Sequence, residues 1–134
     1  TAVLDCPRGG VKPMFQLTVH DYFSSAHQLK GYRGKCEAVH GHNWRVEVTV
    51  QGEVLNGIGL LMDFTDLKKL LKSVIDPMDH VMLNDIGGLR GENPSSEIIA
   101  RYIFNQMKGG LPAGIAMHSV TVWESENARA LYCE

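Results

Sequence analysis

An alternating run of apolar and polar residues over 42–51 is the feature that most constrains how this 134-residue chain folds. Trp44 and the alternating valines that follow it fall on one face of an extended strand, and polar residues fall on the other. His40 and His42 share the parity of the apolar face, so an extended strand projects both imidazoles to its buried side. The run therefore predicts a half-buried strand that begins with two candidate metal ligands.

A second alternating segment begins at Phe15 and continues to His27. His27 has the parity of the apolar residues in this segment, so it points to the buried face if no bulge intervenes. A lone buried histidine is most simply a hydrogen-bonded core residue, because a buried charge is costly. Two adjacent antiparallel strands would bring His27 to His40 and His42, and three neutral imidazoles are a common catalytic zinc set.

The loop over 28–39 delivers Cys36 to the start of the second strand. Basic residues in this loop favour the thiolate, which is the reactive form of cysteine. Cys36 can be the fourth ligand of a closed structural site, or it can stay off the metal as a nucleophile or base of an open site. The spacing alone does not decide between these two alternatives.

Two amphipathic helices are expected next. The first lies between an N-cap at Asp63 and Pro77, and the second lies between Pro94 and Gly109. The stretch over 76–93 between them has no periodicity and reads as a long loop, which in a small domain is more often functional than not. It contains Asp79-His80, a carboxylate beside an imidazole, the groups that make up a general base and its orienting partner.

Two short strands close the chain, one around Val120 and Val122 and one over 129–134. Glu124 falls where an apolar side chain would continue the valine face. An inward carboxylate is costly without donors, so Glu124 either binds something or lies at a wet edge. If it belongs to the site, it is a candidate catalytic group together with Cys36 and Asp79-His80. The order of elements is ββααββ, which predicts an α+β fold with an antiparallel four-stranded sheet and two helices on one face. The open sheet edges favour a homo-oligomer.

Composition narrows the classes of function. A formal net charge of −2 gives no electrostatic case for binding nucleic acid or an anionic membrane. No apolar run approaches the length of a membrane span, and the N-terminus lacks the apolar core of a signal peptide. Three cysteines are an odd count, which favours free thiols and a reducing, cytoplasmic location. We expect an irregular lead-in over 1–13 and a single domain over 14–134.

Several spaced motifs resemble the 6-pyruvoyl-tetrahydropterin synthase superfamily, and within it the bacterial 6-carboxytetrahydropterin synthases of queuosine biosynthesis. The motifs are Phe23-Ser24-Ser25-Ala26-His27, Cys36-x-x-x-His40-Gly41-His42, Met62-Asp63-Phe64-x-x-Leu67-Lys68, Met78-Asp79-His80-x-x-Leu83-Asn84, Asn93-Pro94-Ser95-Ser96-Glu97 and Trp123-Glu124. The short spacing between the cysteine and His40 is similar to that of the bacterial branch.

The resemblance implies the tunnelling fold (T-fold), whose subunits join edge to edge into a β-barrel, commonly as a trimer or a hexamer. It implies the substrate 7,8-dihydroneopterin triphosphate and a product, 6-carboxytetrahydropterin, formed with loss of acetaldehyde and triphosphate. The implied residue roles are zinc ligation by His27, His40 and His42, a thiolate base at Cys36, proton relay by Asp79 and His80, a pterin anchor at Glu124, and further pterin contacts from Ser95 and Ser96.

Glu37 departs from the plainest family pattern. Members that cleave the dihydroneopterin side chain to 6-hydroxymethyl-dihydropterin, for folate synthesis, carry a glutamate in the equivalent position. Glu37 is therefore either a substrate-binding residue that can also react, or a solvent-facing loop residue. The alternative activities are this cleavage and the pyruvoyl-tetrahydropterin reaction. The non-enzymatic alternative is a zinc- or pterin-binding protein in which Cys36 closes the metal site.

Overall fold

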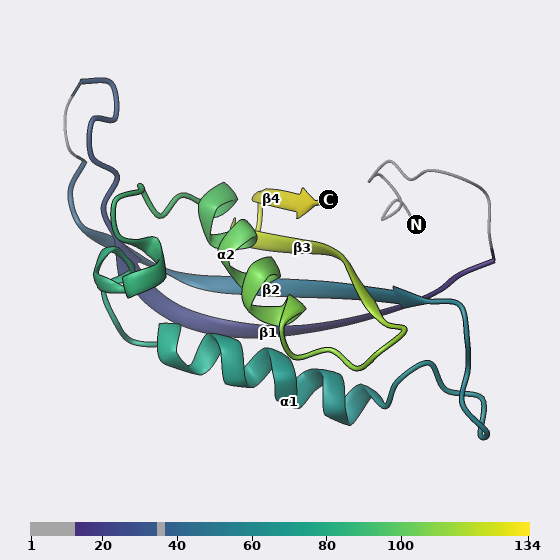
Figure 1. Ribbon diagram of the computed structural model, residues 1–134. Coiled ribbons are helices and arrows are strands. Elements are labelled where there is room, and N and C mark those ends of the chain that lie inside the picture. Colours follow the sequence, from purple (N-terminus) through teal and green to yellow (C-terminus); the bar gives the residue numbers. More distant parts are fainter. Residues whose placement is uncertain (1–12, 35–36) are drawn as a thin grey trace.

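The computed structural model of the chain describes residues 13–34 and 37–134 (Figure 1). Across these residues, four strands form one antiparallel sheet in the order β1-β2-β3-β4. The strands are β1 (Phe15–His27), β2 (His40–Gly52), β3 (Ala116–Ser125) and β4 (Ala128–Cys133). Two described helices, α1 (Phe64–Ile75) and α2 (Ser96–Lys108), lie between β2 and β3 in sequence, so the expected α+β order of elements is confirmed.

The register of β1 and β2 sets the position of the histidines. The two strands pair along their full length, with Phe15 opposite Gly52 at one end and His27 opposite His40 at the other. Side chains alternate across each strand, so the buried face that carries Val19 and Phe23 ends at His27, which is 1% exposed. The predicted inward parity of His27 is therefore confirmed, and no bulge interrupts the β1–β2 pairing before it.

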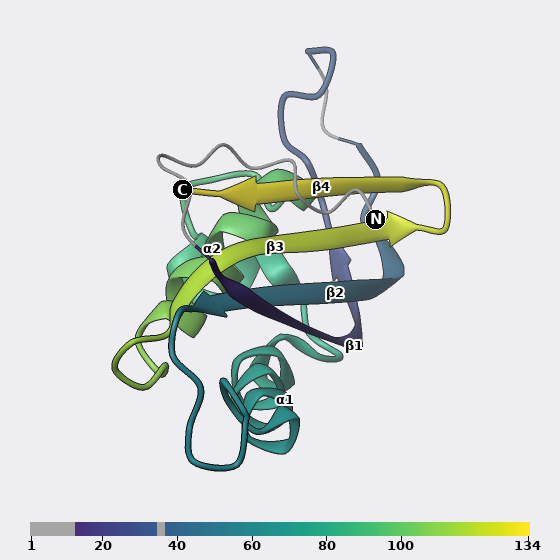
Figure 2. The same ribbon diagram turned by 90° about the vertical axis from the view of Figure 1, so that its right-hand side faces the viewer.

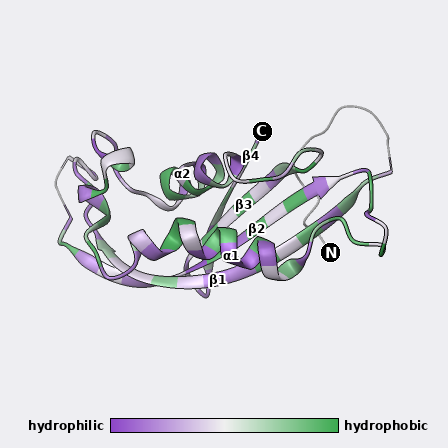
Figure 3. Ribbon diagram, turned by 60° about the horizontal axis from the view of Figure 1, so that its bottom comes forward, coloured by the Kyte–Doolittle hydropathy of each residue, from purple (hydrophilic) through white to green (hydrophobic). Residues whose placement is uncertain are grey.

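Both helices pack on the sheet, α1 along β1 and α2 along β3 and β4 (Figures 1 and 2). Their apolar faces form one core with the buried face of the strands. Figure 3 shows hydrophobic and hydrophilic residues interspersed along both helices, as expected for amphipathic helices on a sheet. Asp63 is the N-cap of α1, as predicted, and its carboxylate accepts a hydrogen bond from Thr65 N at 2.8 Å. The N-cap of α2 is Ser95, so Pro94 precedes the cap and does not occupy the first helical position.

The segment between the helices is more ordered than the expected irregular loop. Three short 3₁₀ turns occur in this described segment, at Asp76–Met78, Leu83–Asp85 and Gly87–Leu89. Each turn buries one apolar side chain in the core: Met78, Leu83 and Leu89. The sequence of this segment shows no helical or strand periodicity because each turn is too short to repeat a pattern and buries only one side chain.

Two further expectations concern the cysteines and the membrane. Cys133 is disulfide-bonded, so the expectation of free thiols is wrong at this residue, and the argument from free thiols to a reducing compartment loses that support. Cys6 and Cys36 lie outside the described residues, as does most of the expected lead-in. Among the helices that the structure describes, none is long and apolar enough to cross a membrane.

Candidate metal centre

In the described part of the chain, three histidines and one glutamate meet at one end of the sheet. His27 ends β1, His40 and His42 open β2, and Glu124 lies near the end of β3. One possible ligand atom from each of these four side chains lies within 4.8 Å of the others. The structure thus brings together the three predicted ligands and adds the carboxylate of Glu124, which the sequence predicts as a reacting group and substrate contact and not as a metal ligand.

Backbone carbonyls orient two of the three imidazoles. His27 Nδ1 lies 2.8 Å from the carbonyl oxygen of Pro94, and His40 Nδ1 lies 2.8 Å from that of Ala38. A carbonyl oxygen can only accept, so each Nδ1 carries the proton and each Nε2 of the neutral ring presents a lone pair. The two Nε2 atoms lie 3.1 Å apart. Two lone pairs at this distance repel each other unless a proton or a cation lies between them, so the arrangement suits metal ligation.

His42 completes the set from the same strand. Its Nε2 lies 3.0 Å from Glu124 Oε1, yet within the described residues it is a buried nitrogen without a hydrogen-bond partner. Burial lowers the pKa of His42, against the opposing attraction of the Glu124 carboxylate. The lowered pKa favours the neutral ring, which can present a nitrogen lone pair to a metal. Three such rings and a carboxylate are donors that suit a divalent transition metal such as zinc, so the residues fit the implied cofactor.

Trp44 packs against two of the imidazoles of the cluster. Its side chain is fully buried, and the centroid of its ring lies 5.0 Å from those of both His27 and His42. The indole Nε1 donates to the carbonyl oxygen of Ser25 at 3.1 Å, which fixes the ring against β1. The sequence showed Trp44 as a member of the apolar face, and its contact with the site follows from the parity it shares with His42.

Glu37 points toward the cluster. Its Oε1 lies 3.7 Å from His40 Nε2, and this buried oxygen has no hydrogen-bond partner in the described structure. The side chain is 25% exposed, so it is not the solvent-facing loop residue of the simpler alternative. Cys36, its neighbour and the predicted thiolate base, lies outside the described residues, and its assignment stays a prediction.

Asp79 and His80 form a contact pair away from the histidines. Asp79 Oδ2 lies 2.8 Å from His80 Nδ1, and Asp79 Oδ1 accepts a hydrogen bond from Ser24 N at 2.8 Å. The hydrogen bond from Ser24, followed by that from His80, holds the pKa of Asp79 below its ordinary value. His80 adopts a φ of 55° and its side chain is 79% exposed. Hydrogen bonds between this pair and the backbone of Ser24 place it beside β1, an edge strand of the sheet. In the described structure, no hydrogen bond or ion pair links the pair to the three histidines.

Ser95 and Ser96 lie at the start of α2. The Ser95 hydroxyl accepts a hydrogen bond from Ile98 N at 3.2 Å and so caps the helix. Both side chains are partly exposed, and neither belongs to the group of four candidate metal ligands. The contact that this segment makes with the cluster comes from the backbone of Pro94, which no side-chain pattern indicates.

Comparison with known proteins gives similarity over most of the chain. The model of the family described as 6-pyruvoyl tetrahydropterin synthase matches residues 16–134. A 6-carboxy-5,6,7,8-tetrahydropterin synthase of Synechocystis sp. is 40% identical, over 82% of this chain and 86% of that protein. A dihydroneopterin monophosphate aldolase of Pyrococcus furiosus is 35% identical, over 76% of this chain and 82% of its own.

The fold is also found in solved structures. The 6-pyruvoyl tetrahydropterin synthase of Caenorhabditis elegans matches with a TM-score of 0.77 at 26% identity, over 91% of this chain and 96% of that one. The T-fold expected from the sequence is therefore confirmed for the single chain. Proteins named for three different reactions are similar to this chain over most of its length, so similarity supports the family more firmly than the product.

Proposed function

Because the chain belongs to the 6-pyruvoyl tetrahydropterin synthase family, we propose that it is a zinc-dependent 6-carboxytetrahydropterin synthase of queuosine biosynthesis. The proposed substrate is 7,8-dihydroneopterin triphosphate, which takes up one water and loses acetaldehyde and triphosphate to give 6-carboxytetrahydropterin. The observation that carries the proposal is the meeting of His27, His40 and His42 with Glu124 within 4.8 Å. The similarity to the Synechocystis synthase supports the choice of product.

The roles of the cluster follow from its donors. Zinc held by the three imidazoles would act as a Lewis acid toward the oxygen atoms of the substrate side chain. Glu124 anchors the pterin, because a carboxylate accepts two N–H donors of a guanidine-like edge as a fork. Its side chain is 37% exposed, so one carboxylate can face both the histidines and an incoming ring. Ser95 and Ser96 are the proposed additional pterin contacts.

Proton transfer is assigned to groups outside the cluster. Cys36 is the proposed base, and His80 is the proposed relay, held by Asp79 through the 2.8 Å contact. Because this pair lies at the outer edge of β1, we assign it to a site that a neighbouring subunit completes. The proposed assembly is a homo-oligomer, a trimer or a hexamer, whose sheets join through their edges.

A product assay tests the function directly. The zinc-loaded protein is incubated with 7,8-dihydroneopterin triphosphate, and the products are identified by mass spectrometry beside a His42→Ala control. The expected product is 6-carboxytetrahydropterin, formed by the unaltered chain and not by the control. If the unaltered protein forms other pterins and none of this product, the proposal is wrong.

A second candidate reaction is supported by Glu37. Its buried Oε1 lies 3.7 Å from His40 Nε2 without a hydrogen-bond partner in the described residues, the position of a base that acts beside the cluster. This orientation favours cleavage of the dihydropterin side chain to 6-hydroxymethyl-dihydropterin as an additional or alternative activity. The similarity to the Pyrococcus aldolase points the same way. The product assay distinguishes this cleavage, and the pyruvoyl reaction, from the leading proposal.

The non-enzymatic alternative is a zinc- or pterin-binding protein in which Cys36 closes the metal site. The alternative predicts that Cys36→Ala loses zinc, whereas the synthase proposal predicts that zinc stays.

A further inference from the structure

The outer edge of β1 is hydrogen-bonded by the segment that links the two helices. Ser24 O accepts from His80 N at 2.6 Å, and Ala26 N donates to the carbonyl oxygen of Val81 at 3.1 Å. Ala26 also forms an isolated parallel bridge with Met82. Backbone groups of this linking segment therefore cover the edge of β1 as far as the residue before His27. The residues that follow His27 are hydrogen-bonded by other groups.

Two asparagine side chains form hydrogen bonds with the backbone of the residues that follow His27. Asn84 Oδ1 accepts from Gln28 N and Asn84 Nδ2 donates to Gln28 O, each at 2.9 Å. Asn93 makes the same pair of bonds with the backbone of Lys30, each at 2.8 Å. A side-chain amide offers the same donor and acceptor as a peptide group, so each asparagine acts as one residue of an added strand. The backbone is thereby held at Gln28 and Lys30, in the segment that follows the end of β1 at His27.

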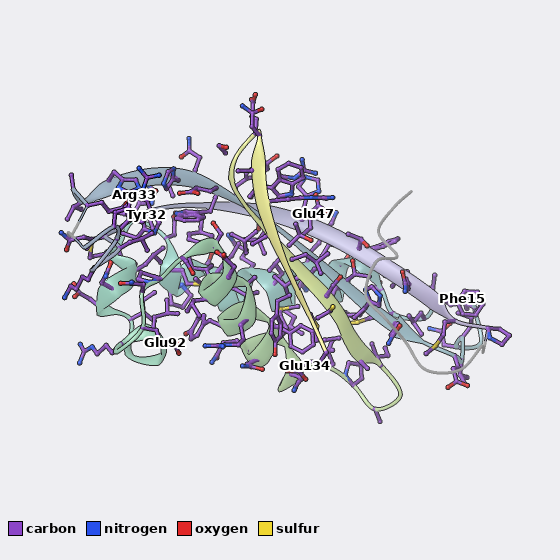
Figure 4. All side chains as sticks on the ribbon, turned by 90° about the horizontal axis from the view of Figure 1, so that it is seen from above. Phe15, Tyr32, Arg33, Glu47, Glu92 and Glu134 are labelled. Atoms are coloured by element: carbon purple, nitrogen blue, oxygen red, sulfur yellow. The ribbon has the colours of Figure 1, made fainter. Side chains whose placement is uncertain are left out.

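Residues 28–30 support Glu37 on their other side. Glu37 N donates to the carbonyl oxygen of Leu29 at 3.2 Å, and Gln28 Nε2 donates to Glu37 O at 3.0 Å. The Glu37 carboxylate therefore reaches His40 from a backbone that rests on residues 28–30. Figure 4 places Tyr32 and Arg33 of the same loop at one end of the molecule, together with Glu92, which precedes Asn93, and far from Phe15.

Asn93 also acts on His27. It is followed directly by Pro94, whose carbonyl oxygen accepts the His27 Nδ1 hydrogen bond at 2.8 Å. The side chain of Asn93 ties this point of the chain to Lys30, so the orienting carbonyl and the strand that carries His27 are held at a fixed separation. One residue thus connects the loop of Glu37 with the orientation of a candidate metal ligand.

We propose that Asn84 and Asn93 are positioning residues, which hold Glu37 against His40 and keep the His27 imidazole aimed at the metal. The inference rests on the proposed function for the identity of the reaction, and on the hydrogen bonds alone for the positioning. Neither amide belongs to the group of candidate ligands among the described residues. Removal of either one leaves the ligands in place and loosens the segment that supports them.

The test compares Asn84→Ala and Asn93→Ala with a matched control, Asn56→Ala. Asn56 likewise bonds backbone amides through its side chain, accepting from Ile58 N and Leu60 N at 3.0 Å each, in a loop that contributes nothing to the cluster. Hydrogen exchange of the Gln28, Lys30 and Glu37 amides is followed in the zinc-loaded full chain, and zinc affinity is measured by competition with a chromophoric chelator. Chemical denaturation gives the global stability of each variant.

The expected result is faster exchange at Glu37 in both site variants, together with zinc affinity lowered about tenfold, the lower end of losing an outer-shell partner. In the product assay, kcat falls while KM for the pterin substrate stays near its original value. The Asn56 control, at a comparable loss of stability, leaves all three readouts unchanged. Glu37 exchange and zinc affinity that stay at the original values in both site variants would overturn the positioning role.

The two proposals fail in different ways. If the original chain makes no pterin product while the site variants still change Glu37 exchange and zinc affinity, the proposed function is wrong and the positioning role stands. If the chain is an active synthase and both variants match the Asn56 control, the positioning role alone is wrong. Because Asn84 and Asn93 bond different residues, one variant that fails to fold leaves the other as an independent test.

Discussion

Glu124 Oε1 lies 3.0 Å from His42 Nε2 and 3.9 Å from His27 Nε2. A carboxylate on β3 therefore reaches imidazoles on both β2 and β1, across the full width of the strands that form the site. This contact places the proposed pterin anchor beside the proposed metal. Substrate binding and metal binding are then neighbouring events that share one side chain.

The substitution Glu124→Gln separates these two roles. It keeps the shape and one acceptor oxygen but loses the charge, so charge-assisted hydrogen bonds to the pterin weaken. Such bonds contribute about 1.5–3 kcal/mol each, and loss of one lowers pterin affinity roughly 10- to 150-fold. Zinc should stay, because three imidazoles remain. Pterin affinity is measured by calorimetry, with Glu126→Gln as the neighbouring control. Unchanged pterin affinity would remove Glu124 from the binding site.

Replacement of His42 tests the metal assignment. His42→Ala removes the nitrogen that has no hydrogen-bond partner in the described structure, while the two carbonyl-oriented rings stay in place. Zinc affinity should fall by more than the roughly 10- to 100-fold typical of losing an outer-shell group. The zinc-dependent rise in melting temperature should shrink accordingly. His20→Ala, on the same sheet and outside the cluster, is the control, and stoichiometric zinc in His42→Ala would contradict the assignment.

Most of the cluster was predictable because strand parity relates residues that are close together in sequence. Strand parity alone put His27, His40 and His42 on the buried side, and the observed register of β1 and β2 places His27 opposite His40. The cap at Asp63 and the helix that follows it have an equally local pattern. When the role of a residue depends on residues two to four positions away in sequence, periodicity and capping chemistry are sufficient to find it.

The remaining parts of the site depend on contacts between distant segments. Asn84 reaches Gln28 across 56 positions, and the Pro94 carbonyl reaches His27 across 67. A side-chain amide that bonds the backbone as a strand residue would, or a backbone carbonyl that orients a ring, produces no periodic pattern in the sequence. Glu124 was found as an anomaly on an apolar face, but its distance to His42 depends on the bulged pairing near the end of β3. Such features follow from the fold and not from any one segment.

Cys36 and Glu37 should separate by product. With Cys36→Ala, we expect zinc near its original content and loss of 6-carboxytetrahydropterin formation, because the base is removed and the ligands remain. With Glu37→Gln, we expect that product to persist while any 6-hydroxymethyl-dihydropterin disappears. Both variants are assayed with 7,8-dihydroneopterin triphosphate by mass spectrometry. Loss of zinc in Cys36→Ala would favour the closed, structural metal site instead.

The acid stability of the fold should depend on Asp79. Its pKa is lowered from 3.8 by the hydrogen bonds from Ser24 and His80, so the folded state favours the ionised carboxylate. The stabilisation is fully present above the pKa of the unfolded chain and is lost as pH falls through the lower pKa of the folded state. The difference in free energy of unfolding between the original chain and Asp79→Asn should therefore be constant near neutrality and shrink below about pH 4. Urea unfolding between pH 2 and pH 7 measures it, with the exposed Asp85→Asn as control. A difference independent of pH would contradict this account.

The last prediction concerns how Asp79 and His80 serve the cluster. His80→Ala and His42→Ala should each inactivate a homo-oligomer, one by removing the relay and the other by removing a ligand. If each site takes its histidine cluster from one subunit and its Asp79–His80 pair from a neighbour, random mixing of the two variants restores intact sites. With equal amounts of both, about one quarter of all sites should be intact, which is about one third of the sites in the purified mixed trimers. Co-expression with two different tags, sequential purification of mixed oligomers and the product assay measure the recovery. Mixed oligomers that stay inactive would show that one subunit must supply both groups. The segment that carries His80 would then have to move within its own chain for His80 to reach the metal.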